Sequence, residues 1–178
     1  MKKIIVSLLI LTGLSTLKAN AQMAAAQNIK WDITKEAEID MDQETIWAIL
    51  GEPELIGKAS NGYVRTIAET DENSTASRKI IFANGDIRLE KIVQHDKENN
   101  FMVIHFAPAS LPKGVTSAEI SIFSKAKGDK CNIALKAVVK GDSEAKKALI
   151  AKLTTEFENY IAGLKNIAEN SVPATTME

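Results

Sequence analysis

Cysteine is almost absent from this sequence, which contains one Cys in 178 residues. A single thiol cannot form a disulfide within the chain, so a disulfide-stapled scaffold is excluded. Histidine is nearly as scarce, with two residues, and neither forms a zinc-type cluster with Cys131. The sequence therefore predicts no metal site. Cys131 lies in a strand-like segment and is predicted to be a buried thiol.

Three further features are missing. Lys and Arg total 22 against 23 Asp and Glu, so there is no basic excess for nucleic acid to bind. Beyond residue 21 no apolar run approaches the roughly 20 residues that cross a bilayer, so no stable membrane insertion is expected after signal cleavage. No phosphate-loop glycine spacing and no Ser or Cys nucleophile with a visible base partner occurs. We therefore expect no cofactor, and the sequence carries no catalytic signature.

The first residues have the pattern of an export signal. Lys2 and Lys3 precede an apolar run over residues 4–17, and the small residues Ala19 and Ala21 lie just before the predicted cleavage site. This pattern predicts a signal peptide at residues 1–21 with cleavage after Ala21. No cysteine lies at that site, so a lipoprotein is excluded. We expect a periplasmic or secreted protein.

Cleavage would leave 157 residues, the size of one ordinary domain. The signal holds three of the 22 basic residues and none of the 23 acidic residues, so the mature net charge is near −4. Residues 22–29 are predicted to be a flexible lead-in, 30–170 the folded domain, and 171–178 a disordered tail.

The mature chain begins with a strand and two short helices. Apolar and polar residues alternate from Trp31 to Met41, which favours a half-buried strand. Asp42 is placed to cap a helix whose apolar side is supplied by residues 46–50. A second short helix is expected over 54–59.

Strand-like segments separated by turn residues fill the middle of the chain. They cover residues 63–69, 78–82, 87–94, 101–106, 115–124 and 131–140. Asn84-Gly85 between two of them is a strong hairpin signal. Their even spacing predicts a continuous antiparallel meander.

The last segment is a long amphipathic helix that begins after Gly141-Asp142-Ser143 and ends near Asn170. Its apolar residues recur at intervals of three and four. They are Ala145, Leu149, Leu153, Phe157, Tyr160, Ile161, Leu164 and Ala168. A helix of this length needs a broad apolar surface, which the sheet would provide.

This order of elements resembles the START-like (SRPBCC) superfamily, which includes birch-pollen-allergen-like, polyketide cyclase/dehydrase and lipid-transport branches. The resemblance covers roughly residues 30–170. It is carried by the strand-to-helix segment 39–50, the hairpin 78–90 and the stripe of Phe157, Tyr160 and Leu164. It implies an α+β helix-grip fold. A curved antiparallel sheet of six or seven strands would wrap the long C-terminal helix, with two short helices after the first strand.

Such a fold leaves a space between the sheet and the helix. Aromatic residues make up 5% of the chain, too few to fill a wide space, so we expect a cavity for a small hydrophobic molecule. The alternative is a core filled by large side chains. The residues expected to line the cavity are Ile92, Glu90, Ile104, Phe106, Leu111, Phe157, Tyr160 and Leu164.

Three polar residues are weak catalytic candidates. The resemblance implies that Glu90, and with it Arg88, points into the cavity, although their face of the strand could equally meet solvent. His105 lies in a strand with two apolar faces, where it is either a pocket base or a hydrogen-bonded structural residue. The loop 107–114, with Leu111 at its tip, is either a lid over the cavity or an ordinary surface loop.

Three functions follow as hypotheses. The first is an exported carrier of a small apolar or amphipathic ligand. The second is an enzyme of the cyclase or dehydratase type that uses dispersed cavity residues, which the lack of a catalytic motif disfavours. The third is an interaction module or homodimer that packs through the apolar strand 101–106.

Overall fold

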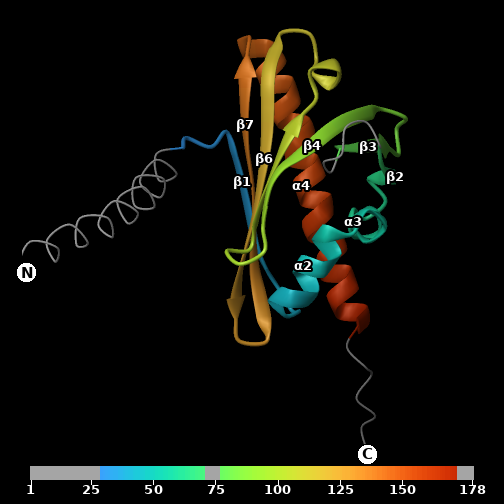
Figure 1. The fold of residues 1–178 in the computed structure, drawn as a ribbon, viewed down its shortest axis with the longest axis vertical. Helices are drawn as coiled ribbons and strands as arrows, with labels where there is room; N and C mark the ends of the chain where they lie inside the picture. The colour runs from blue at the N-terminus through green and yellow to red at the C-terminus, as the bar shows by residue number, and fades with distance from the viewer. Residues whose placement is uncertain (1–28, 71–76, 172–178) are drawn as a thin grey trace, which may run out of the picture. The chain divides into compact units, whose positions relative to one another are not determined.

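The computed structural model describes residues 29–70 and 77–171. The predicted signal peptide, nearly all of the lead-in and the tail beyond residue 171 lie outside the described residues. Within those ranges the order of elements is one strand, two short helices, six strands and a long helix, as the sequence predicts (Figure 1).

The first strand, β1 (Ile33–Ile39), leads directly into α2 (Gln43–Gly51). Asp42 caps this helix as predicted, because its Oδ1 accepts a hydrogen bond of 2.9 Å from the backbone N–H of Thr45. α2 buries the side chains of residues 46, 47, 49 and 50. The short α3 (Pro53–Ala59) follows.

The remaining strands form the predicted meander. They are β2 (Val64–Glu69), β3 (Ser77–Phe82), β4 (Ile87–Asp96), β5 (Phe101–Phe106), β6 (Val115–Lys127) and β7 (Lys130–Gly141). The sheet order is β1-β7-β6-β5-β4-β3-β2, with antiparallel neighbours throughout. A short 3-10 turn, η1 (Pro108–Ser110), lies in the loop between β5 and β6.

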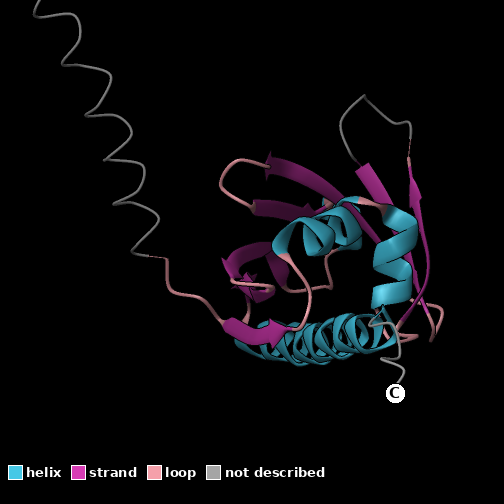
Figure 2. Cartoon of the chain, turned by 90° about the horizontal axis from the view of Figure 1, so that it is seen from below, coloured by secondary structure: helices cyan, strands magenta, loops and turns pink. Residues whose placement is uncertain are grey.

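The long helix α4 (Ser143–Ser171) has 29 residues and lies against the sheet. Figure 2 shows the strands curving around the helices, which is the predicted helix-grip arrangement. The buried side chains of α4 include Leu149, Leu153, Phe157 and Leu164. They contribute to a core shared with α2 and with buried residues of four strands, β1, β5, β6 and β7.

Gly163 brings α4 and α3 into backbone contact. A Cβ atom at this position would lie 2.0 Å from the carbonyl oxygen of Ala59 and 2.9 Å from the backbone nitrogen of Asn61. Any larger residue would force the two helices apart, because the atoms it meets are backbone. Glycine at 163 therefore fixes the spacing between α3 and α4.

A β-bulge in β4 decides which of its side chains face α4. The register between β4 and β5 shifts between Ile92 and Gln94. Before the bulge, Arg88 and Glu90 point inward and are buried. At the bulge Val93 is 44% exposed. The extra residue interrupts simple alternation, so Gln94 does not share the inward face of Glu90 as strict alternation would predict.

Candidate functional site

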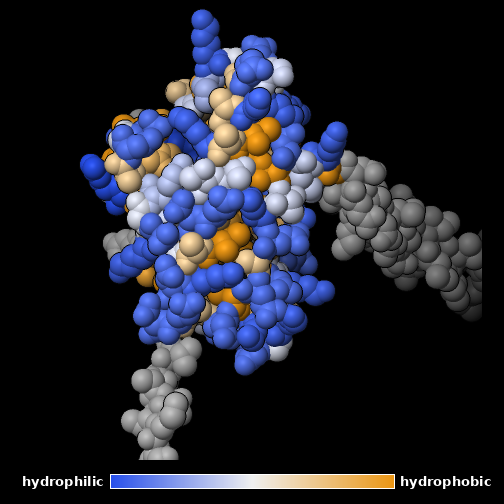
Figure 3. Space-filling model, turned by 180° about the vertical axis from the view of Figure 1, so that it is seen from behind, coloured by the Kyte–Doolittle hydropathy of each residue, from blue (hydrophilic) through white to orange (hydrophobic). Residues whose placement is uncertain are grey.

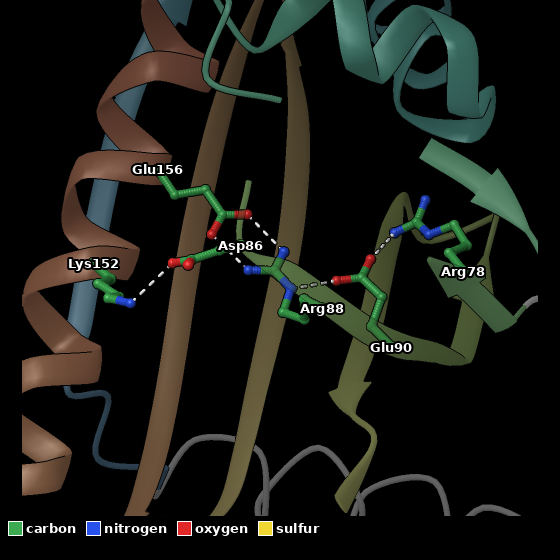
Figure 4. Close-up of polar contacts among 6 residues, drawn as sticks. All are labelled: Arg78, Asp86, Arg88, Glu90, Lys152 and Glu156. Atoms are coloured by element: carbon green, nitrogen blue, oxygen red, sulfur yellow. Dashed lines mark hydrogen bonds and ion pairs between the residues drawn. The ribbon is translucent and has the colours of Figure 1, made fainter. Parts of the chain in front are cut away.

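Four charged side chains form a continuous chain of hydrogen bonds between the sheet and α4 (Figure 4). Both terminal nitrogens of Arg88 donate to the carboxylate of Glu156, at 2.7 Å each. The Nε of Arg88 donates to Glu90 Oε2 at 2.9 Å, and Nη2 of Arg78 donates to Glu90 Oε1 at 2.7 Å. We call these four residues the buried charge network.

Local geometry explains how three members of the network meet. Arg88 and Glu90 are two residues apart on β4, so their side chains share one face of the strand. Arg78 on β3 is the direct cross-strand partner of Glu90. Glu156 comes from α4, 68 residues from Arg88, and meets it only because the helix packs on the sheet.

The network is almost fully removed from water. The exposed side-chain fractions are 4% for Arg78, 9% for Arg88, 1% for Glu90 and 3% for Glu156. Burying charges is costly unless each one is paired, and here two cations balance two anions. Burial by itself lowers the pKa of Arg88, but the carboxylates of Glu156 and Glu90 outweigh it and the pKa is raised.

Two aromatic rings frame the central guanidinium. The Cζ atom of Arg88 lies 4.4 Å from the ring centre of Phe106 and 5.0 Å from that of Phe82. Both contacts are within cation–π range. With three hydrogen bonds and two ring contacts, Arg88 is held rigidly at the centre of the site.

An inner cavity of about 30 Å³ lies beside the network. This volume has room for about one or two water molecules. Its lining combines the four network residues with apolar side chains and Tyr160; the full set is Leu50, Ile56, Arg78, Arg88, Glu90, Ile104, Ile120, Ile122, Ile133, Leu135, Glu156, Phe157, Tyr160 and Leu164.

The wide apolar hollow expected from the scarcity of aromatic residues is not observed between the sheet and α4 in the described ranges. The expectation assumed that only Phe and Trp fill a wide space. Here the long side chains of two arginines and two glutamates occupy the middle, and isoleucine and leucine fill most of the rest.

A larger pocket of about 340 Å³ opens to the surface next to this cavity. It lies between the β3–β4 hairpin, the loop 109–112 and one side of α4, and we call it the mouth pocket. Aromatic and aliphatic side chains make up much of its lining, including Tyr63, Phe82, Phe106 and Leu111. Arg88 and Glu156 line both spaces, so they form the boundary between the mouth pocket and the inner cavity.

An exposed ion pair borders the mouth pocket. Nζ of Lys152 on α4 lies 3.1 Å from Oδ2 of Asp86 in the β3–β4 turn. Figure 4 shows this pair beside the buried charge network. Its side chains are 65% and 53% exposed, so the pair is largely solvated. It connects the hairpin to α4 at the outer end of the site.

The sequence-predicted site residues fall into two groups around this boundary. Glu90, Ile104, Phe157, Tyr160 and Leu164 line the inner cavity. Phe106 and Leu111 line the mouth pocket. The lid loop proposed over 107–114 thus contributes Leu111 to the pocket wall.

Two predicted residues lie elsewhere. Ile92 packs against the core but lines neither space. His105 lies on the outer face of β5 with a 51% exposed side chain, and its Nε2 lies 3.0 Å from Glu119 Oε2. His105 is the cross-strand partner of Lys91, so its side chain lies on the face of the sheet opposite to Arg88 and Glu90. Backbone or side-chain atoms of both His105 and Glu90 nevertheless line a separate open pocket of about 1040 Å³, together with Arg78, Phe106 and Leu111.

Two members of the network, Arg78 and Glu156, are absent from the sequence-based set of site residues. Glu156 lies three residues after Leu153 and four before Tyr160, so a helical wheel places it on the apolar stripe of α4. Arg78 lies two residues before the buried Ile80, so both residues share the buried face of β3. A charge inside an apolar period was the signal that could have identified both.

Burial, followed by the nearby carboxylate of Glu156, raises the pKa of Tyr160 above its ordinary value. The same two causes raise the pKa of Tyr63. Both phenols therefore keep their protons at neutral pH and can donate hydrogen bonds.

In the part of the chain that the structure describes, no group of His, Cys, Asp and Glu is arranged to hold a metal, and no helix has the length and hydrophobicity to cross a membrane.

No protein-family model matches the chain, and no curated protein matches its sequence. Solved structures match by fold. XoxI from Bacillus cereus has a TM-score of 0.66 at 14% identity, over 78% of this chain and 95% of that one. The di-domain ARO/CYC BexL from the BE-7585A biosynthetic pathway has a TM-score of 0.66 at 11% identity, over 79% of this chain and 47% of that one.

Norcoclaurine synthase from Thalictrum flavum, in complex with dopamine and hydroxybenzaldehyde, has a TM-score of 0.61 at 18% identity, over 79% of this chain and 87% of that one. At these identities the likeness shows the fold. The shared fold is the helix-grip fold, which the resemblance to the START-like (SRPBCC) superfamily implies.

Proposed function

We propose that this protein binds a small amphipathic molecule in the mouth pocket, with its apolar body against the pocket's aromatic and aliphatic side chains. The observation that carries the proposal is that an open pocket with both apolar and polar walls adjoins buried, fixed charges. A pocket of about 340 Å³ is at the lower end of the range for small-molecule sites, which begins at roughly 300 Å³. Its ligand is therefore small.

The arrangement of the pocket supports selectivity for amphipathic guests. Phe82 and Phe106 offer apolar surface at the inner wall, and the guanidinium of Arg88 between them offers polar recognition. Sites of this kind combine a mainly apolar lining with a few positioned polar groups. Norcoclaurine synthase, which shares the fold, is described in complex with two small aromatic molecules.

The surroundings of the three catalytic candidates, Glu90, Arg88 and His105, favour ligand binding over catalysis. Both carboxylate oxygens of Glu90 accept a hydrogen bond from a guanidinium, so this carboxylate is held within the buried charge network and does not line the mouth pocket. Arg88 donates three of its five N–H groups to Glu156 and Glu90, so it is a fixed recognition group and not a proton-transfer group. His105 is on the other face of the sheet and outside the pocket.

The interaction-module alternative receives less support. β5, its proposed contact strand, is hydrogen-bonded to β4 on one side and β6 on the other, so it has no free edge. Its outer Phe101 stacks on Phe123 with ring centres 5.9 Å apart. Figure 3 shows one face of the molecule as mostly hydrophilic with small separate apolar patches, whereas large contiguous patches mark interaction surfaces.

The binding proposal is tested with N-phenyl-1-naphthylamine, a neutral fluorophore of suitable size. Its emission should rise on addition of the purified protein. Ala109→Trp should abolish the rise, because Ala109 lines the mouth pocket and an indole there would fill it. Ala148→Trp is the matched control, since Ala148 is exposed on α4 and does not line the pocket. No rise with the wild-type protein, or equal loss in both variants, would contradict the proposal.

We also propose that the carrier acts outside the cytoplasm, on the strength of the signal-like pattern in residues 1–21. Expression of the full chain in a bacterial host should yield a secreted or periplasmic product whose N-terminus is Gln22, as read by N-terminal sequencing. A product that stays in the cytoplasm and still carries residues 1–21 would refute export.

A further inference from the structure

Arg78 is the least satisfied member of the buried charge network. Its side chain is 4% exposed, and Nη2 donates to Glu90. Its Nε and Nη1 atoms have no hydrogen-bond partner among the described residues. Arginine carries five N–H donors, so most of the donors of Arg78 are buried without a protein acceptor. Buried donors in this state are destabilising unless another acceptor reaches them.

Arg78 lies where an acceptor from outside the protein can arrive. It lines the inner cavity together with Arg88, Glu90 and Glu156. Of these, Arg88 and Glu156 also line the mouth pocket. The carboxylate of Glu90 lies between the guanidinium groups of Arg78 and Arg88 and accepts a hydrogen bond from each. A ligand seated in the mouth pocket therefore lies next to this cavity, and its polar group enters where the hydrogen-bonded pair of Arg88 and Glu156 moves aside. Arg78 and Glu90 also line a second open pocket of about 1040 Å³.

Charge balance determines which polar group fits. The network contains two cations and two anions and is neutral without a ligand. A ligand carboxylate or ammonium would add an unpaired charge in a desolvated space, which is strongly unfavourable. A carbonyl oxygen accepts two hydrogen bonds and adds no charge. A hydroxyl oxygen also accepts and adds no charge, but it brings a proton that needs an acceptor of its own, whereas a carbonyl oxygen brings none.

We propose that the inner cavity is a subsite for a neutral hydrogen-bond acceptor, such as a ketone or amide carbonyl, on a ligand whose apolar body lies in the mouth pocket. This inference rests on the proposed function and narrows it to a ligand class. Arg78 is the specificity-determining residue, and Tyr160, which also lines the cavity, is a second available donor.

Four probes with the same ring system test the subsite. 2-Acetylnaphthalene carries a ketone, 2-isopropenylnaphthalene replaces its oxygen by a CH₂ group, 2-naphthoate is an anion, and 2-naphthylmethylamine is a cation. Dissociation constants are measured at pH 7 by competition with N-phenyl-1-naphthylamine. The ketone should bind at least about tenfold more tightly than each of the other three probes, a difference of about 1.4 kcal/mol.

The double variant Arg78→Met/Glu90→Gln removes the free donors and keeps the network neutral, since Arg88 and Glu156 remain paired. The ketone's advantage over the hydrocarbon should fall to less than about twofold, while hydrocarbon affinity stays within about twofold of wild type. Thermal unfolding checks that this variant folds. If it does not fold, Arg78→Lys keeps a cation for Glu90 but lacks the Nε and Nη1 donors, and the ketone advantage should again be lost.

Each outcome separates the two proposals. Equal binding of the ketone and the hydrocarbon overturns the subsite and leaves the mouth pocket as a plain apolar site. Tighter binding of either ion, or an unchanged ketone advantage in a folded Arg78 variant, also overturns it. Failure of all four probes to bind removes the proposed function and the subsite together.

Discussion

Removing the charge of Glu156 should destabilise the protein severely. In Glu156→Gln the neutral amide cannot balance Arg88, and its NH₂ group meets an arginine donor. The two 2.7 Å hydrogen bonds join side chains that are 3% and 9% exposed, so solvent cannot replace the lost carboxylate. Breaking one side of a buried pair costs about 3–5 kcal/mol. A domain has roughly 5–15 kcal/mol of stability in total, so this loss is a large share of it.

A double-mutant cycle distinguishes lost pairing from general damage. Arg88→Met alone strands Glu156 and Glu156→Leu alone strands Arg88, whereas Arg88→Met/Glu156→Leu removes both charges and leaves the neutral pair of Arg78 and Glu90. The double variant should be more stable than the sum of the single changes by at least about 2 kcal/mol, within the range measured for residues in contact. Urea unfolding followed by far-UV circular dichroism gives each value, and a constant m-value supports the two-state treatment.

Asp86→Asn is the matched control. It breaks the neighbouring exposed pair with Lys152, whose side chains are solvated, and should leave the urea midpoint unchanged. The reasoning would be refuted if Glu156→Gln cost less than about 1 kcal/mol, because a charge stranded in a dry interior cannot be that cheap. Strictly additive single and double variants would refute direct pairing.

Three further results are expected. Gly163→Ala should lower the free energy of unfolding by about 1–3 kcal/mol in urea, because the new Cβ would lie 2.0 Å from the backbone of Ala59. Gly57→Ala is the control: no atom lies within 4 Å of its Cβ, so it should be neutral or stabilising. The raised pKa of Tyr160 means that the folded state holds the phenol proton more tightly than the unfolded chain does. The stability gained from this proton is complete below the ordinary pKa of 10.0 and is lost as pH rises through the pKa of the folded state. Tyr160→Phe should therefore flatten the fall in Tm at alkaline pH. His105→Gln should leave the binding of N-phenyl-1-naphthylamine unchanged, as measured by fluorescence titration, because the side chain lies on the outer face; a tenfold loss would contradict this placement.

The local pattern of the sequence was sufficient for the elements and their order. Asp42 before an apolar turn predicted the start of α2, and Asn84-Gly85 predicted the β3–β4 hairpin, because capping and tight turns depend on residues close in sequence. The apolar period of α4 predicted its length and its buried face, since 3.6 residues per turn leave one stripe for the core.

Which face of β4 is buried depended on the whole fold. The sequence left open whether Arg88 and Glu90 meet solvent, and a charged face ordinarily does. They turn inward because Arg78 lies opposite on β3 and Glu156 arrives from α4 to balance the charges. That balance requires partners from two other elements, one of them 68 residues from Arg88.

The size of the interior was also a tertiary result. Counting aromatic residues by themselves predicted a wide hollow, but the long side chains of the buried charge network occupy the centre and leave about 30 Å³. Composition cannot show which arginines and glutamates are buried. Local periodicity in the sequence therefore determined the elements and their order, and the resemblance to the START-like superfamily implied the helix-grip architecture. Packing between distant segments decided the buried charges, the closed interior and the open mouth pocket.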